Sequence, residues 1–265
     1  MWKLVRSAIV IVGVAVTTVV TPPATSSAAA SRPPGGGIAS IQPAQGAVVG
    51  VAHPVVVQFS APVLDRRAAE RAIAVRSTPP MTGSFEWVDA TEVQWVPDHY
   101  WPAHSTVKLS VGKLSADFST GAKVVGVASI SAHTFTVTVD DEEAGPLPAP
   151  HHRPHWGEDG VLPATMGKSE FPTPTGNYTV LAKDKKVLMD SSSVGIPIDD
   201  PEGYRFDVEQ AVRISRRGLY VHSAPWALGS LGLENVSHGC VGLSPTDAEW
   251  YFDRVNIGDP VIIKE

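Results

Sequence analysis

The chain has 265 residues, of which 43% are hydrophobic and 18% charged, and its formal net charge is −6 at pH 7. This acidic balance, without any block of Lys and Arg, argues against a protein that binds nucleic acid through its phosphates. Glycine and proline number 23 each, and together with frequent Val and Thr they favour many short strands joined by turns.

The N-terminus has the pattern of an export signal. A short basic start is followed by an apolar run over residues 8–20, too short to span a bilayer comfortably, and then by small residues suited to cleavage. We therefore expect a signal peptide over residues 1–30, with an uncleaved N-terminal anchor as the alternative. Residues 31–37 are rich in Pro and Gly and predict a linker. The expected location is the periplasm or cell wall.

Residues 38–119 carry short apolar runs between turn signals. Residues 55–59, 91–96 and 106–111 are the clearest, and the last two alternate apolar and polar side chains as half-buried strands do. Residues 66–72 predict a short helical turn. This spacing is typical of a small immunoglobulin-like sandwich. The aromatic residues of this part are expected in its core and rim rather than on a sugar-binding surface: Phe85, Trp87, Trp95 and Trp101.

From residue 120 onward the chain changes character. Residues 124–128 and 134–139 predict two strands, and residues 173–180 a turn leading into another. The polar stretch 203–217 has the composition of a flap. Residues 218–222 predict a strand that ends in a histidine, His222.

One helix is expected near the C-terminus. Ser244 is a good N-cap, Pro245 suits the first helical position and Asp247 stands where a capping-box acid belongs. Asn256 and Gly258 are suited to ending this helix, and residues 260–263 predict a last strand.

The single cysteine of the chain, Cys240, follows Ser237, His238 and Gly239. An unpaired cysteine in an exported protein indicates either an intermolecular disulfide or a reactive thiol. A thiol of ordinary pKa is only roughly 3% ionised at pH 7, so a nucleophile needs a base, and His222 and His238 are both candidates. Gly239 lets the backbone approach a ligand, where N–H groups can bind an oxyanion. Spacing alone leaves open a buried cysteine packed against two histidines.

The residues around these candidates resemble a known family. Residues 220–226 (YVHSAPW), 237–241 (SHGCV) and 243–244 resemble the active-site signature of L,D-transpeptidases. Residues 166–168 (MGK), the Thr-Pro-x-Gly turn at 173–176 and residues 189–192 (MDSS) resemble the same catalytic domain, which would cover residues 120–265. Residues 38–118 resemble the bacterial immunoglobulin-like modules that precede this domain in actinobacterial members. The resemblance implies a mainly β protein with an N-terminal sandwich, a catalytic β-fold and a late α-helix.

In that family the reaction is acyl transfer on peptidoglycan stem peptides. The resemblance implies that Cys240 attacks a donor tetrapeptide at the L-centre of diaminopimelate, and that the thioester passes to a second diaminopimelate in a 3→3 cross-link. His222 would be the general base, the Ser223 carbonyl would orient its ring, and His238 with Gly239 would shape the oxyanion site. Substrate contacts would come from Tyr204, Met189, Trp226, Ser237 and Asn235. No metal or organic cofactor is implied, and carbapenems are expected as covalent inhibitors.

Two departures from the family pattern keep alternatives open. Many members have asparagine where this chain has Gly242, and many carry an aromatic on the flap near Ser215, where this chain has Arg216 and Arg217. The arginine pair either meets a stem-peptide carboxylate or forms a solvated flap face. An L,D-carboxypeptidase, with water as acceptor, and a non-catalytic wall-binding protein are the competing functions. Papain-like endopeptidases rank low because their cysteine precedes the histidine in the chain.

A second cluster of polar residues has side chains of the types that bind zinc: His151, His152, His155, Glu158 and Asp159. Prolines surround it and no helical ligand spacing repeats, so we expect a polar loop without a metal. The first domain is expected to act as a spacer, with glycan binding as the alternative.

Overall fold

The computed structural model describes residues 37–73, 75–111, 113–143 and 160–265. Three predicted features lie outside these residues: the expected signal peptide, nearly all of the expected linker, and the polar cluster at 151–159. Among the residues described, no helix has the length and apolar character needed to cross a membrane.

The first half of the described chain forms the predicted sandwich, from two four-stranded sheets. One sheet has the order β1 (Ile38–Gln42), β3 (Val55–Phe59), β6 (Glu92–Pro97), β5 (Gly83–Trp87), and the other β2 (Val48–Val49), β8 (Leu114–Thr120), β7 (Thr106–Val111), β4 (Arg76–Thr78). The expected helical turn is α1 (Arg66–Ile73). Alternate residues of β3 and β7 are buried, and for β7 this matches the alternation that predicted the strand.

Aromatic side chains fill the core of this sandwich. The Trp101 ring is only 2% exposed and lies 5.9 Å from the Trp95 ring and 5.6 Å, edge-on, from the Phe118 ring. Phe85 and Trp87 pack against the same cluster from its margin. The prediction that these aromatics belong to core and rim is confirmed.

The second half is built on one mixed sheet of ten strands. Its order is β13 (Gly176–Thr179), β18 (Pro260–Lys264), β9 (Val124–Ser129), β10 (Thr134–Val139), β12 (Val161–Thr165), β17 (Val241–Leu243), β16 (Tyr220–Ser223), β15 (Arg205–Arg213), β14 (Ala182–Asp190), with β11 (Glu142–Glu143) paired to β10. Two pairs of neighbouring strands in this sheet are parallel: β18 with β9, and β16 with β17. The second of these pairs places His222 level with Gly242.

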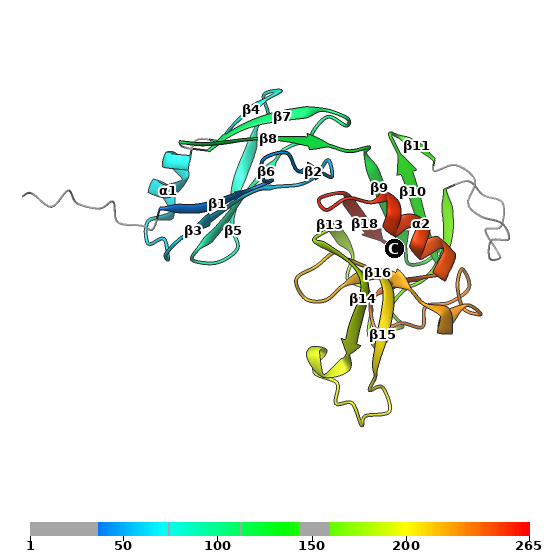
Figure 1. The fold of residues 1–265 in the computed structure, drawn as a ribbon. Coiled ribbons are helices and arrows are strands. Elements are labelled where there is room, and N and C mark those ends of the chain that lie inside the picture. Colours follow the sequence, from blue (N-terminus) through cyan, green and yellow to red (C-terminus); the bar gives the residue numbers. More distant parts are fainter. Residues whose placement is uncertain (1–36, 74, 112, 144–159) are drawn as a thin grey trace, which may run out of the picture. The chain divides into compact units, whose positions relative to one another are not determined.

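The long hairpin of β14 and β15 is the predicted flap, and Figure 1 shows it running beyond the other strands of its sheet. The sequence predicted a flap only over residues 203–217 and no strand in β14, because β14 carries charged residues at 183–186 and shows no buried face. Its tip holds the 3₁₀ turn η1 (Ser191–Val194) and a tight turn over residues 197–203. Gly203 is needed there, since a Cβ would lie 2.4 Å from the Ile198 carbonyl oxygen.

The predicted helix is α2 (Pro245–Arg254), and it contacts β15 and β16. Its N-cap is Ser244, whose Oγ accepts from the Asp247 N–H at 3.1 Å and donates to the Asp247 carboxylate at 2.7 Å. The helix buries Ala248, Tyr251 and Phe252, and the Tyr251 ring meets Phe135 edge-on at 4.9 Å. The N-cap therefore fixes where the helix starts on the sheet that carries His222.

Ser244→Ala is expected to lower the free energy of unfolding by about 1 kcal/mol, because the first turn loses its side-chain acceptor. Urea unfolding followed by circular dichroism measures the change. Ser244→Thr keeps the hydroxyl, and its free energy of unfolding is expected to stay within a few tenths of a kcal/mol of wild type. An equal loss of stability in both variants would contradict the capping role.

Candidate active site

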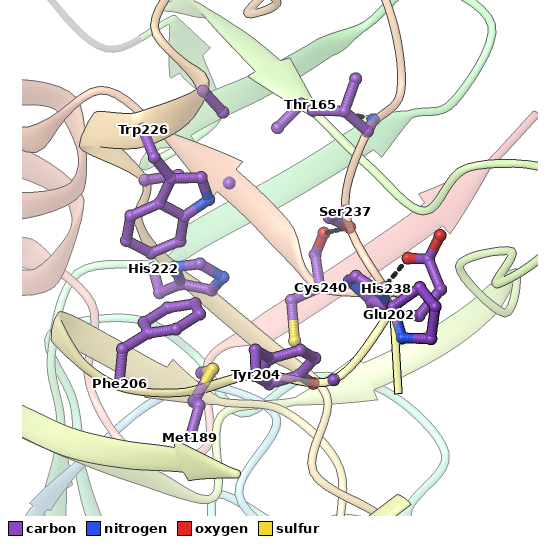
Figure 2. Close-up of a pocket in the computed structure, with 16 residues that line it drawn as sticks. Thr165, Met189, Glu202, Tyr204, Phe206, His222, Trp226, Ser237, His238 and Cys240 are labelled. Carbon is purple, nitrogen blue, oxygen red and sulfur yellow. Dashed lines mark hydrogen bonds and ion pairs between the residues drawn. The ribbon is translucent and has the colours of Figure 1, made fainter. Parts of the chain in front are cut away.

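A cavity of about 280 Å³ opens between the flap and the ends of β16 and β17. Its walls include Met189, Tyr204, Phe206, Trp226 and His238, and both Cys240 and His222 face into it (Figure 2). The structure thus brings together the two residues predicted to carry the chemistry, although eighteen positions of sequence separate them.

His222 is held in one orientation by the chain itself. Only 4% of the residue is exposed, and Nδ1 donates to the Ser223 carbonyl at 2.8 Å. The Trp226 ring stacks on the imidazole at 5.9 Å. A proton fixed on Nδ1 leaves Nε2 as the basic atom of the neutral ring. Burial lowers the pKa of His222, so the ring stays neutral at and somewhat below neutral pH.

Cys240 is a neutral thiol in this state. Burial raises its pKa to about 11, and a hydrogen bond from the Tyr220 backbone offsets only part of that rise. The Sγ–H donates to the Gly218 carbonyl at 3.7 Å. Neutral thiol and neutral imidazole therefore coexist at pH 7, so nucleophilic attack by this thiol would require the proton to leave the sulfur while the new bond forms.

The loop that carries the thiol is fixed by two hydroxyl groups. Ser237 Oγ accepts from the Gly239 N–H at 3.1 Å and donates to the Cys240 carbonyl at 2.7 Å. Thr173 Oγ1 donates to the Gly239 carbonyl at 2.7 Å and accepts from the Gly167 N–H at 2.8 Å. Gly239 has φ +117°, a conformation that strongly favours glycine.

These contacts explain two of the upstream motifs. The threonine of the Thr-Pro-x-Gly turn and the glycine of the Met-Gly-Lys segment meet at Gly239, one residue before the thiol. Thr173 was not predicted as a site residue, although its motif was recognised. The Gly239 N–H is engaged by Ser237 in this state, so it binds an oxyanion only after giving up that bond.

The wall opposite the thiol is aromatic. Tyr204, Met189 and Trp226 line it as the resemblance implied, and Phe206 completes it at 4.8 Å from Trp226 and 5.5 Å from Tyr204. Phe206 was missed by the sequence analysis. The signal was present, because alternate residues of a strand share a face and Tyr204 was already placed there.

Asn235 lies outside the cavity lining. Its Oδ1 accepts from the Met166 N–H at 2.9 Å and faces His133 Nδ1 at 3.0 Å, and its Nδ2 donates to the Ile130 carbonyl at 3.0 Å. The side chain ties the segment before Ser237 to the sheet. Ser237 lines the cavity, whereas Ser223 and Gly239 contribute through main-chain groups.

The two departures from the family pattern have structural settings. At Gly242, a Cβ would lie 2.9 Å from Thr165 Cγ2 and 3.0 Å from the Ala224 Cβ, so these neighbours occupy the space a larger residue needs. Arg216 Nη2 donates to Glu92 Oε1 at 2.5 Å, and Arg216 is not among the residues lining the cavity. The carboxylate that Arg216 meets here is therefore the chain's own.

An immunoglobulin-like sandwich ahead of a mixed sheet, with a thiol and an oriented imidazole in one cavity, defines a class of two-domain transpeptidase. Residues 21–117 match the model of a bacterial Ig domain and residues 125–263 that of an L,D-transpeptidase catalytic domain. The chain belongs to the L,D-transpeptidase family.

Individual relatives agree with this assignment. The chain is 64% identical over 264 residues to the probable L,D-transpeptidase 3 of Mycobacterium tuberculosis, covering 97% of each protein. A crystal structure of L,D-transpeptidase 3 from that organism, in complex with a faropenem-derived adduct, is 68% identical and matches with a TM-score of 0.82 over 86% of this chain and 98% of the other. The structure of LD transpeptidase LdtMt1 in complex with imipenem is 48% identical, with a TM-score of 0.78 over 86% and 99%.

Thr173→Val is expected to destabilise the protein by roughly 2 to 4 kcal/mol, because it leaves the Gly167 N–H and the Gly239 carbonyl without their shared partner. Urea unfolding measures the loss. Thr173→Ser retains the hydroxyl and is expected to recover most of the lost stability; equal losses in the two variants would contradict the role of the hydroxyl, because only Val lacks it.

Alkylation of Cys240 by iodoacetamide is expected to accelerate with pH up to about 10 without a plateau, because the thiolate is the reacting form and its population keeps rising toward a pKa near 11. Intact-mass kinetics measure the rate. The same protein in denaturant is the control, with a plateau expected from about pH 9. A plateau below pH 7 in the folded protein would indicate a thiolate–imidazolium pair and contradict the neutral pair described above.

Proposed function

We propose that this protein is an exported peptidoglycan L,D-transpeptidase that forms 3→3 cross-links between diaminopimelate residues through a thioester on Cys240. The observation that carries the proposal is the neutral His222, oriented by the Ser223 carbonyl, in the same cavity as the chain's only cysteine. Membership of the L,D-transpeptidase family supports the substrate class.

In the first half-reaction, Cys240 Sγ attacks the carbonyl carbon at the L-centre of diaminopimelate in the donor tetrapeptide. His222 Nε2 takes the thiol proton as the carbon–sulfur bond forms, and the resulting imidazolium donates that proton to the leaving nitrogen. The carbon–nitrogen bond breaks, D-alanine departs, and a thioester remains. Main-chain N–H groups near Gly239 are proposed to stabilise the oxyanion, with His238 shaping that side of the site.

In the second half-reaction, the side-chain amine of another diaminopimelate attacks the thioester. His222 accepts a proton from the amine and returns it to the sulfur, which leaves as the carbon–nitrogen bond of the cross-link forms. The enzyme ends as it began, with a neutral thiol and a neutral imidazole. Every proton moves between groups of this chain and its substrates, so the scheme requires neither a metal nor an organic cofactor.

We assign donor binding to the aromatic wall. Tyr204, Phe206, Met189 and Trp226 offer apolar surface for the aliphatic part of a stem peptide, and Ser237 supplies a polar group beside the thiol. Asn235 is proposed to act through the loop it supports rather than by touching substrate.

Covalent inhibition by β-lactams is part of the proposal. The relative bound to a faropenem-derived adduct and the relative bound to imipenem support Cys240 as the residue these compounds acylate here. The N-terminal sequence pattern supports export by a signal peptide, and we propose that the immunoglobulin-like domain is a spacer for the catalytic domain within the wall.

Wild-type protein incubated with a disaccharide tetrapeptide is expected to release D-alanine, to form a Cys240 adduct and to produce a cross-linked dimer in mass spectrometry. Cys240→Ala abolishes adduct and product, and His222→Ala slows adduct formation by at least about 100-fold because the general base is lost. His99→Ala, which removes an exposed histidine of the first domain, serves as the control and is expected to match wild type.

Each contrary outcome has a distinct meaning. A tripeptide product without dimer would show that the protein is an L,D-carboxypeptidase rather than a transpeptidase. The absence of both adduct and product would overturn the thioester mechanism.

A further inference from the structure

Two charged residues at the edge of the cavity, Glu202 and Lys168, have no part in the scheme above. Glu202 lies in the tight turn at the tip of the flap, and its Oε2 accepts from His238 Nε2 at 2.9 Å and from Lys168 Nζ at 2.6 Å. The three residues come from three separate segments: the stretch after β12, the flap, and the loop two residues before Cys240. One carboxylate oxygen therefore ties the flap both to the loop before Cys240 and to the stretch that follows β12 (Figure 2 shows the bond between Glu202 and His238).

Glu202 is held ready for this contact by its own turn. Its N–H donates to Asp200 Oδ1 at 2.9 Å, and the next N–H, of Gly203, donates to the Asp200 carbonyl at 2.7 Å. The turn lies close against the carbonyls of Pro197 and Ile198, where only a glycine fits at position 203. The carboxylate is thus presented from a fixed backbone rather than from a free loop.

His238 is likewise fixed from several sides. The Phe171 ring lies 4.8 Å and the Tyr204 ring 5.0 Å from the imidazole, and Nε2 faces Glu202. A carboxylate accepts but cannot donate, so Nε2 carries the proton in this contact. Tyr204 belongs to the donor wall, so a shift of the flap that breaks the Glu202 contact moves both His238 and that wall.

Exposure argues against a role in global stability. The side chains of Lys168, Glu202 and His238 are 27%, 42% and 24% exposed, and pairs of this kind contribute little to folding. They are also screened by salt, in contrast to the apolar packing of the cavity wall. Contacts of this kind can break and re-form readily, so they are better suited to a flap that opens and closes than to stabilising the fold.

We propose that Glu202 is a positioning residue that latches the flap over the thiol, with Lys168 and His238 as its two anchors, and so sets the geometry of the donor site. Substrate entry and product release require the latch to open, and acylation proceeds from the closed state. The inference rests on the proposed thioester chemistry for its effect on rate, whereas the latch itself is a property of the unliganded chain.

The flap carries a matched control. Lys186 Nζ and Asp207 Oδ2 form an ion pair at 2.8 Å between β14 and β15, with side chains 59% and 52% exposed, and neither residue lines the cavity. Glu202→Gln and Asp207→Asn each remove one negative charge from the same hairpin at nearly constant size. A general effect of flap charge would appear in both variants, whereas a latch would respond only to the first.

Hydrogen exchange of the unliganded protein tests the latch without any chemistry. In Glu202→Gln, amides 196–206 are expected to exchange about five- to tenfold faster than in wild type, because the anchoring charge is lost. Raising NaCl from about 0.05 to 0.5 M is expected to accelerate amide exchange in wild type toward the rate of the variant, and to leave the exchange rate of the variant unchanged. Unchanged exchange in Glu202→Gln, or an equal effect in Asp207→Asn, would overturn the proposal.

Acylation of Cys240 by imipenem, followed by intact mass, tests the effect on geometry. Glu202→Gln is expected to lower the second-order acylation rate about fivefold, Lys168→Met by less, and the double variant by no more than Glu202→Gln alone, since both act through one contact. Faster flap exchange with an unchanged acylation rate would overturn the positioning role. A wild-type protein that is not acylated at all would refute the proposed function, and the exchange experiment would still decide the latch.

Discussion

The parallel pairing of β16 with β17 is the constraint on which the site depends. In a sheet that is otherwise largely antiparallel, it sets His222 level with Gly242, two residues after Cys240, so a histidine and a cysteine distant in sequence share a cavity. Parallel neighbours need a long crossover, and here the crossover contains the 3₁₀ turn η2 (Pro225–Ala227) with Trp226. The same connection therefore supplies the ring that stacks on His222.

Local patterns in the sequence predicted much of the fold. The N-cap at Ser244, the alternation in β7 and the short helix α1 each rest on nearby residues, and each lies where it was expected. The strand β14 did not follow this logic, because its stability comes from pairing along the whole of β15 rather than from a buried face. Hydrophobic periodicity carries no signal for a strand exposed on both sides.

The site divides in a similar way. Cys240 and His222 were candidates from the residues themselves, and Tyr204 and Trp226 were predicted through the resemblance. Their presence in one cavity depends on strand register that the sequence does not encode locally. Thr173 bonds to Gly239, and Glu202 bonds to Lys168 and His238. These partners are far away in the chain, so no spacing rule could identify either residue. Asn235 illustrates the converse, since an amide near the motif satisfies backbone groups of the sheet rather than the cavity.

The burial that keeps the Cys240 sulfur protonated has a consequence for its resistance to oxidation. Peroxides and disulfides attack the thiolate and hardly react with the protonated form, so a cysteine held neutral until a substrate arrives is poorly susceptible to adventitious oxidation. With no second cysteine in the chain to form a repairable bond, over-oxidation to sulfinic acid would be permanent. A thiol kept unionised by burial therefore resists oxidation, and it reacts readily only when a nearby base takes up its proton.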